Sequence, residues 1–499
     1  MEPNTTTKGK GKYFKVDINE ASVLDIFSIY FSKKIVRGTR ERNIISFHPN
    51  VNKKILERPG ILSASVLVQL CFKLIEQLFS GVGSRFEDLI NIMFNDNIFT
   101  QLLINKLQGK LPVLDKESES YVSAIGCLDK RVDLDINPDN SKYFPLLSAL
   151  ASKVVYENKN FVKAAVEGQW KMELLGSYDF YNDDHGSNTT QAMIFHDKHA
   201  NPDRIIVAFR GTEPFDANAW CTDFDISWLS FPEFGKIHYG FMKALGLQEG
   251  DSWPQHIDND DNPHCQSMIE KLSSLCCGKD EQPLPEIVQA KEGQNLYAYY
   301  TIRKVLRKML NKNTKTKFIV TGHSLGGALA VLFPAVLAFH NEDSILEKLE
   351  AVYTFGQPRV GNSSFGRYMK KKFKEFGVTY NRYVYNNDIV PRVPLDNSVL
   401  MFRHFGNCFL YDSHYFYKEI TGHLHEHYFM RLLFTYMKMS WDAFRKMAEG
   451  LRRPKRESLP LLVIRFAAIW FPWSAFVDHN PQDYINSVRF GRVRPGEEN

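Results

Sequence analysis

The sequence predicts an α/β protein with a mainly parallel central sheet and a helical N-terminal extension. From about Phe144 onward, short runs rich in β-branched and aromatic residues alternate with helix-like stretches. Such alternation is typical of a parallel sheet with helices on its faces. Residues 1–140 instead contain helix candidates and irregular stretches, without repeats. A chain of 499 residues is long enough for one large domain with extensions, or for two domains.

The strand candidates set the expected domain boundaries. In chain order they read "AMIFHD", "RIIVAFRG", "KFIVTG", "EAVYTFGQP" and "YNRYVYNNDIVPRVP". We therefore expect a helical region over residues 1–140 and the sheet-containing domain over residues 141–499. An acidic stretch near 246–294, which also contains Pro and Cys, is expected to be a surface insertion.

Charge and cysteine content exclude several classes of protein. The net charge of +5 arises from 62 basic and 57 acidic residues, a balance that does not indicate a nucleic-acid-binding protein. Seven cysteines without a C-x-x-C pair predict neither a disulfide framework nor a zinc site, so we infer a reducing compartment. The stretch "MEPNTTTKGKGKYFKVDINE" lacks the apolar core of a signal peptide, and secretion is not expected.

Two apolar stretches are candidates either for core packing or for contact with a lipid surface. Residues 65–79 form a predicted amphipathic helix. Its apolar face holds Leu67, Leu70, Cys71, Leu74, Ile75 and Leu78, and its polar face holds Gln69, Lys73, Glu76 and Gln77. Residues 459–477, "LPLLVIRFAAIWFPWSAFV", are almost wholly apolar. Arg465 inside this stretch, with Pro460 and Pro472, argues against one continuous spanning helix.

The stretch "FIVTGHSLGGALAVLF" carries a candidate nucleophile. It reads as a short buried strand, a tight turn with a serine at its apex, and an apolar helix. The turn Gly322-His323-Ser324-Leu325-Gly326 matches G-x-S-x-G, in which the glycines permit a turn too sharp for bulky neighbours. The serine hydroxyl is then held above the sheet end at a helix N-terminus, so Ser324 is the expected nucleophile.

A serine nucleophile needs a base, and the base needs an acid that orients it. In enzymes that use this turn, the acid and then the histidine follow the serine along the chain. Asp388 is the expected acid because it directly follows a strand, and Asp396 and Asp412 are its competitors. His479, in "FVDHNPQDY", is the expected base. The other histidines after Asp388 are His404, His414, His423, His425 and His427.

Amide donors are expected to stabilise the oxyanion that forms during attack on a carbonyl. One is the backbone N–H of Leu325, directly after the nucleophile. The other is expected in a loop after an earlier strand, and "RIIVAFRGT" ends in Arg210-Gly211-Thr212. The Thr212 hydroxyl is a further candidate donor.

The histidine cluster in "HLHEHY" is not expected to bind a metal. His423, His425 and His427 alternate along the chain instead of lying four residues apart, and no Cys or distant His group completes a zinc set. The reaction of an activated serine with an ester needs neither a metal nor an organic cofactor, and none is expected.

Six motifs occur in an order that resembles a known family. They are "VAFRGT", "IHYGF", "VTGHSLGGALA", "YTFGQPRVGN", "YNNDIVPRVP" and "DHNPQDY", spread over roughly Tyr143 to Phe490. In these motifs the chain resembles the class 3 lipases of the α/β-hydrolase superfamily. The resemblance implies an α/β-hydrolase fold and a serine esterase mechanism. It assigns the nucleophile to Ser324, the acid to Asp388, the base to His479, and the oxyanion donors to Thr212 and Leu325.

The resemblance also implies a short lid helix at about residues 214–229, a range that includes Trp220 and Asp223. The helical N-terminal region and the apolar segment make the whole chain look like the plant oil-body lipases. That likeness implies hydrolysis of triacylglycerol at the cytosolic surface of lipid droplets. The expected partners are then an acylglycerol substrate and a lipid-droplet monolayer or membrane surface, without nucleic acid.

Two alternatives to this function stay open from the sequence. A phospholipase A1 or a galactolipase would use the same machinery, because it cleaves any accessible acyl ester. A lipase-like signalling or scaffold protein would keep the fold without hydrolysis. The complete triad argues against this second alternative.

Overall fold

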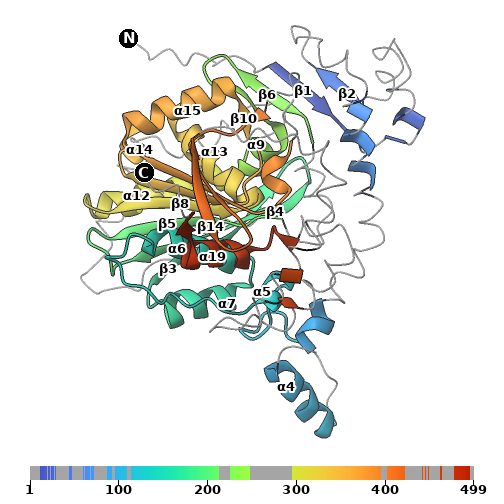
Figure 1. Ribbon diagram of the computed structural model, residues 1–499, viewed down its shortest axis with the longest axis vertical. Helices are drawn as coiled ribbons and strands as arrows, with labels where there is room; N and C mark the ends of the chain where they lie inside the picture. The colour runs from blue at the N-terminus through green and yellow to red at the C-terminus, as the bar shows by residue number, and fades with distance from the viewer. Residues whose placement is uncertain are drawn as a thin grey trace, which may run out of the picture.

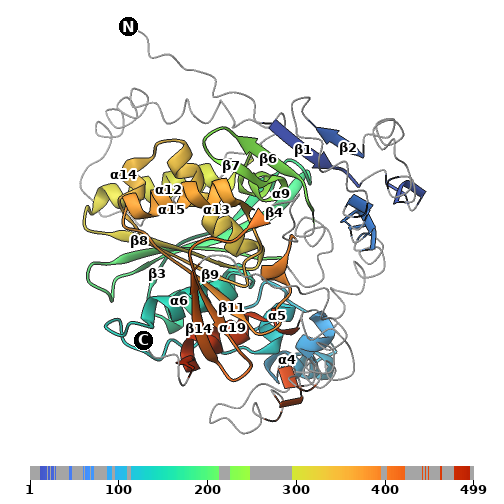
Figure 2. The same cartoon turned by 45° about the horizontal axis from the view of Figure 1, so that its top comes forward.

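The computed structural model describes the larger part of the chain (Figures 1 and 2). The described residues are 12–18, 21–22, 24–26, 29, 44–47, 60, 62–63, 65–67, 69–71, 73, 87–92, 96–109, 114–212, 225–247, 295–394, 402–421, 441, 444–445, 448, 461–462 and 477–494.

A large sheet forms the centre of the described structure (Figure 1). Its strands are, in spatial order, β15 (Arg492–Val493), β14 (Phe416–Thr421), β13 (Asn407–Tyr411), β11 (Thr379–Tyr385), β9 (Leu349–Phe355), β8 (Lys317–His323), β5 (Arg204–Phe209), β4 (Ser187–Asp197) and β3 (Glu173–Asn182). The strands from β13 to β5 are parallel, while β14 and β4 pair antiparallel at either side. The predicted mainly parallel sheet is confirmed, and it contains each strand candidate.

Helices cover both faces of this sheet. One face carries α9 (Tyr239–Leu245), α12 (Ala298–Lys312), α13 (Leu325–Phe339), α14 (Asp343–Leu346) and α15 (Ser363–Glu375), and the other carries α6 (Tyr143–Val154) and α19 (Pro481–Phe490). The side chains of β5 alternate between the two cores. Val207 packs with the first group of helices, and Ile206 and Ala208 pack with the second. Both faces of the parallel strands are therefore buried under helices, as is usual for parallel sheets.

Short elements complete the described chain. They are α4 (Asp96–Leu107), α5 (Ala124–Leu128), α7 (Lys159–Lys163), the π-helix η2 (Ala164–Gln169) and the 3₁₀ helix η4 (Val390–Arg392). Of these, η4 follows β11 closely and lies at the edge where the parallel strands end.

A second, antiparallel sheet joins the N-terminal region to the rest of the molecule. Its strands are, in spatial order, β12 (Phe402–Arg403), β10 (Gly361–Asn362), β7 (Gly235–His238), β6 (Trp228–Phe231), β1 (Lys12–Val16) and β2 (Ile45–Phe47). The sequence predicted helices in residues 1–140, and helical residues are present there, α4 among them. The prediction missed β1 and β2, because strands of five and three residues are too short to show a period.

The predicted faces of helix 65–79 are wrong at three described positions, and one of them is Cys71, which was assigned to the apolar face and is exposed. Leu67, assigned to the apolar face, is 48% exposed, whereas Gln69, assigned to the polar face, is 3% exposed. Gln69 tolerates burial because its side-chain amide donates to Ser65 Oγ at 3.0 Å. The buried side of the helix presents Val66 to an apolar cluster that contains Phe14 of β1.

Three predicted features lie largely outside the described residues. They are the insertion near 246–294, the apolar segment 459–477 and the lid at 214–229. In the described end of the lid range, residues 225–227 are irregular, and Trp228 and Leu229 belong to β6, so this end contains no helix. Among the residues that the structure describes, no helix is both long and apolar enough to cross a membrane.

Candidate active site

Ser324 occupies a sharp turn between β8 and α13. Its φ of 59° and ψ of −131° are strained for a non-glycine residue. The flanking glycines make this turn possible. A Cβ atom added at Gly322 would lie 2.1 Å from the Gly326 carbonyl oxygen, and one added at Gly326 would lie 2.2 Å from the Phe209 carbonyl oxygen. The expected turn is present, at the edge where the parallel strands end.

His479 connects this serine to a buried aspartate. Its Nε2 lies 2.7 Å from Ser324 Oγ, and its Nδ1 lies 2.7 Å from Asp388 Oδ2. An ionised carboxylate can only accept, so Nδ1 carries the ring proton and Nε2 accepts the hydrogen bond from the serine hydroxyl. Asp388 is fully buried, and the other two side chains are nearly so. The structure thus brings the three expected residues into one chain of hydrogen bonds.

The Asp388 carboxylate receives further donors. The backbone N–H of Val390 donates to Oδ1 at 2.8 Å, and the hydroxyl of Tyr484 donates to Oδ2. Burial, together with the Asp388 charge, raises the pKa of Tyr484 well above its usual value, so this phenol stays protonated and can donate. Tyr484 was not predicted as a site residue, although it is the last residue of the motif "DHNPQDY".

The loops that carry the acid and the base are tied to each other. Asp478, next to the base, accepts from Asn386 Nδ2 at 2.9 Å and from the backbone N–H of Asn387 at 3.1 Å. Arg392 donates to the backbone carbonyl oxygens of Asn386 and Asp388. Neither Asp478 nor Arg392 was predicted as a site residue. Their position inside the quoted motifs is the signal that would have found them.

The competing candidates have other partners or lie elsewhere. Asp412 forms an ion pair with Arg494 at 2.9 Å. His404 donates from Nε2 to the carbonyl oxygen of Pro391 at 2.7 Å, and His414 is exposed. The remaining candidates, Asp396, His423, His425 and His427, lie outside the described residues.

Known proteins align with this chain over most of its length. The family described as lipase (class 3) matches residues 206–398, a range that includes Ser324 and Asp388. A protein named triacylglycerol lipase OBL1 from Nicotiana tabacum is 34% identical over 480 residues, which cover 87% of this chain and 84% of that relative. The chain is a class 3 lipase. As a lipase, it hydrolyses carboxylic esters.

Other relatives of this lipase agree with that assignment. The proteins of the same name from Arabidopsis thaliana and Ricinus communis are 34% and 31% identical, over 88% and 86% of this chain and 86% of each relative. Among solved structures, lipase II of Rhizopus niveus is 20% identical with a TM-score of 0.33, over 54% of this chain and 78% of its own. We therefore identify the fold of the lipase from the order of its strands and not from this solved structure.

The two residues expected to donate to an oxyanion lie beside the nucleophile of the lipase. Leu325 is the first residue of α13, and the N–H groups of a first helical turn have no acceptor within the helix. The backbone before Thr212 packs directly on the nucleophile, since a Cβ atom added at Gly211 would lie 2.9 Å from Ser324 Cβ. Thr212 itself is buried. Both expected donors of the class 3 lipase thus adjoin Ser324 along the chain or in space.

Proposed function

We propose that this lipase hydrolyses triacylglycerol through an acyl-enzyme formed on Ser324. The observation that carries the proposal is the unbroken chain of hydrogen bonds from Ser324 Oγ through His479 to Asp388. The positive φ of the buried Ser324 costs free energy of folding. Such strain, next to an imidazole and a carboxylate, is characteristic of functional sites.

The proposed steps follow from which atoms hold protons. His479 Nε2 takes the hydroxyl proton as Ser324 Oγ attacks the ester carbonyl. The resulting oxyanion accepts hydrogen bonds from the N–H groups of Leu325 and Thr212 and from the Thr212 hydroxyl. Asp388 stabilises the imidazolium, which then protonates the alcohol oxygen as the C–O bond breaks. A water molecule, deprotonated by the same nitrogen, attacks the acyl-enzyme and releases the fatty acid.

Triacylglycerol is the proposed substrate because of the relatives that align over most of their length. All three are named triacylglycerol lipases. The catalytic machinery alone would cleave any accessible acyl ester, so the choice rests on this likeness. We assign hydrolysis to residues 141–499 and association with the lipid surface to residues 1–140.

The proposed place of action is the cytosolic surface of lipid droplets. Part of the N-terminal region exposes large apolar side chains on α4, which lies at the edge of the molecule (Figure 1). Leu103, Ile104 and Leu107 are 49%, 47% and 79% exposed, and Lys106 is exposed beside them. Apolar side chains with an adjacent cation suit a phospholipid monolayer, which takes up the apolar groups and attracts the charge.

The first prediction tests the triad and the substrate together. Ser324→Ala, Asp388→Asn and His479→Ala should each lower fatty-acid release from triacylglycerol emulsions by on the order of 10⁴-fold, because triad members act as a unit. Asp412→Asn is the matched control and should keep normal turnover. The measurement is titration of released fatty acid, with circular dichroism of each variant to verify folding.

Emulsions of phosphatidylcholine and galactolipid, assayed in parallel, decide the substrate class. We expect the highest kcat/KM on triacylglycerol. A higher value on either polar lipid would contradict the substrate and leave the triad intact. Normal turnover by Ser324→Ala would contradict the mechanism.

A further inference from the structure

His323, the residue before the nucleophile, is buried against the proposed base. The ring centroids of His323 and His479 lie 4.4 Å apart. His323 Nε2 lies 2.9 Å from the backbone carbonyl oxygen of His479, and His323 Nδ1 lies 2.9 Å from the hydroxyl oxygen of Tyr156. The acyl-transfer steps use neither His323 nor Tyr156, so the reason for these buried contacts lies elsewhere.

The two contacts fix where His323 holds its proton. A carbonyl oxygen only accepts, so Nε2 must carry the hydrogen that is directed at His479. Burial, with the nearby His479, holds the pKa of His323 well below its usual range, so the ring is neutral and has a single N–H. Nδ1 therefore presents a lone pair, and the Tyr156 hydroxyl is its donor. The other tautomer would direct a lone pair at the carbonyl oxygen and lose that hydrogen bond, and its Nδ1–H would instead donate to the Tyr156 hydroxyl oxygen.

Tyr156 is itself held in place between two parts of the site. It follows α6, and its hydroxyl borders the strand end that precedes Thr212. A Cβ atom added at Gly211 would lie 2.1 Å from the Tyr156 hydroxyl oxygen. One side chain thus spans from the proposed oxyanion loop to His323. The side chain of Tyr156 is 4% exposed and donates to Nδ1 from within the core.

We propose that Tyr156 and His323 are positioning residues for the base. The carbonyl oxygen of His479 fixes the proton of His323 on Nε2, Tyr156 stabilises this tautomer by donating to Nδ1, and His323 holds the backbone of His479 by its N–H. The inference rests on the proposed triad. His479 must keep its ring in line between two partners at hydrogen-bond distance, and small displacements of such a group slow the reaction strongly.

The charge of the neighbouring ring matters as well. His479 becomes positive when it takes the serine proton, and a second positive imidazole at ring-contact distance would oppose that step. A neutral His323, with its N–H committed to the His479 carbonyl oxygen, adds no such charge. The same contact therefore orients the base and leaves it free to be protonated.

The test compares three variants of the full-length lipase with one control. His323→Leu removes the N–H donor, His323→Gln restores an amide N–H at that position, and Tyr156→Phe removes only the hydroxyl. Tyr143→Phe is the matched control, because it removes a buried hydroxyl bonded to Asp197 at 3.0 Å, on α6 but away from the triad. The assay uses a soluble short-chain ester, with active sites counted by a phosphonate inhibitor that reacts with the serine.

We expect His323→Leu to lower kcat per active site by roughly 10² to 10³-fold, with KM little changed, because only the orientation of the base is lost. His323→Gln should recover kcat to within about 10-fold of the parent, and Tyr156→Phe should cost about 5 to 30-fold. Tyr143→Phe should keep the parental kcat.

Three outcomes would overturn the positioning role. They are equal losses in His323→Leu and His323→Gln, equal behaviour of Tyr156→Phe and Tyr143→Phe, and losses that vanish once rates are expressed per active site. The last would mean that both residues act only on folding. Ser324→Ala, assayed alongside, separates the two proposals, because activity in that variant contradicts the triad whatever His323 does.

Discussion

At the scale of single residues, Gly356 shows how closely the backbone packs on the proposed triad. It follows β9 and adopts a φ of 60°. A Cβ atom at this position would lie 2.9 Å from His479 Cε1 and 3.0 Å from Asp388 Oδ2. Both the conformation and the lack of space therefore exclude a side chain beside the contact between acid and base.

Gly356→Ala should lower kcat by about 10 to 10²-fold, since the added methyl group must displace His479 or Asp388. Gly377→Ala is the matched control. Gly377 also has a positive φ, of 67°, but a Cβ atom there meets nothing within 4 Å. Both variants should lose about 1 kcal/mol of stability from the backbone conformation, and only Gly356→Ala should lose turnover on a soluble ester. Equal turnover in the two variants, with equal melting temperatures, would refute the steric argument.

The residues of the triad differ in how directly the sequence predicts them. Ser324 follows from a turn whose chemistry is local, and the strand before the five-residue pattern and the helix after it supply the context that predicts the nucleophile. His479 was chosen among several histidines by its place in a loop after the apolar stretch 459–477, and the family resemblance then supported the choice. Its distance to the serine is set by how α19 packs on the sheet. Gly356 and Tyr156 were not predicted, since their contacts to the site join segments that are distant in the sequence.

At the scale of elements, the central strands β4, β5, β8, β9 and β11 of the large sheet were predicted, whereas β3, β13, β14, β15 and the N-terminal helix face were not. Buried parallel strands are apolar throughout, so the strand candidates were visible without knowing their neighbours. A helix face is apolar only where a partner covers it. For Val66 the partner is the cluster around Phe14, which buries Val66 and leaves the neighbouring Leu67 exposed. No periodicity within the helix reveals that partner.

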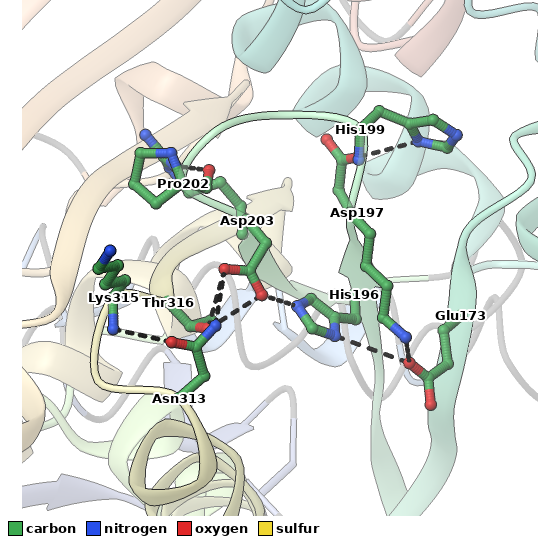
Figure 3. A network of polar contacts seen from close by, with 11 residues as sticks. Glu173, His196, Asp197, His199, Pro202, Asp203, Asn313, Lys315 and Thr316 are labelled. Atoms are coloured by element: carbon green, nitrogen blue, oxygen red, sulfur yellow. Dashed lines mark hydrogen bonds and ion pairs between the residues drawn. The ribbon is translucent and has the colours of Figure 1, made fainter.

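A polar network ties the opposite edge of the sheet together, where β5 and β8 begin (Figure 3). His196 Nε2 on β4 lies 2.5 Å from Asp203 Oδ2, and Thr316 Oγ1 donates to the same carboxylate at 2.9 Å. Burial alone would raise the pKa of Asp203, but the hydrogen bonds from His196 and Thr316 outweigh it and hold the pKa below its usual value.

A carboxyl group with a lowered folded-state pKa stabilises the native state above its unfolded pKa of about 3.9, and this contribution is lost as the pH falls through the folded value. Asp203→Asn should therefore lower the melting temperature at pH 7 by roughly 2 to 4 °C. Its difference from the parent should shrink below about pH 4. Exposed Asp139→Asn is the control and should change little at any pH. Thermal melts between neutral and acidic pH decide the matter, and a pH-independent difference would contradict this account.

At the scale of the whole molecule, the N-terminal region is built into the hydrolase. Val16 on β1 donates its N–H to Ser227 Oγ at 2.8 Å, which fixes the strand beside β6. The buried ammonium of Lys153 binds the backbone carbonyl oxygen of Arg131 at 3.1 Å and Gln482 Oε1 at 2.8 Å, and so links the N-terminal region to the start of α19. Because these pairs lie far apart in the sequence, the sequence alone indicated an extension where the structure shows an integrated region.

Because other parts of the N-terminal region pack against the hydrolase, α4 is the element on which association with lipid can be tested separately from folding. Changes at Val66 or Leu70 would disturb the cluster around Phe14, so loss of droplet binding there would not be separable from misfolding. The apolar side chains of α4 are exposed already, and charges placed on them cost little in folding.

Leu103→Glu combined with Leu107→Glu should therefore release the lipase from lipid droplets, because two carboxylates cannot enter the apolar layer of a monolayer without a large desolvation penalty. Hydrolysis of a soluble short-chain ester should stay at the parental rate. Leu24→Glu combined with Val493→Glu is the matched control, since both side chains are also exposed, at 75% and 42%, but lie outside α4. The measurement is the fraction of protein that floats with purified droplets. If the α4 pair floats like the control pair, α4 is not the docking element, and if the α4 pair also loses soluble-ester activity, its side chains support the fold instead of the lipid contact.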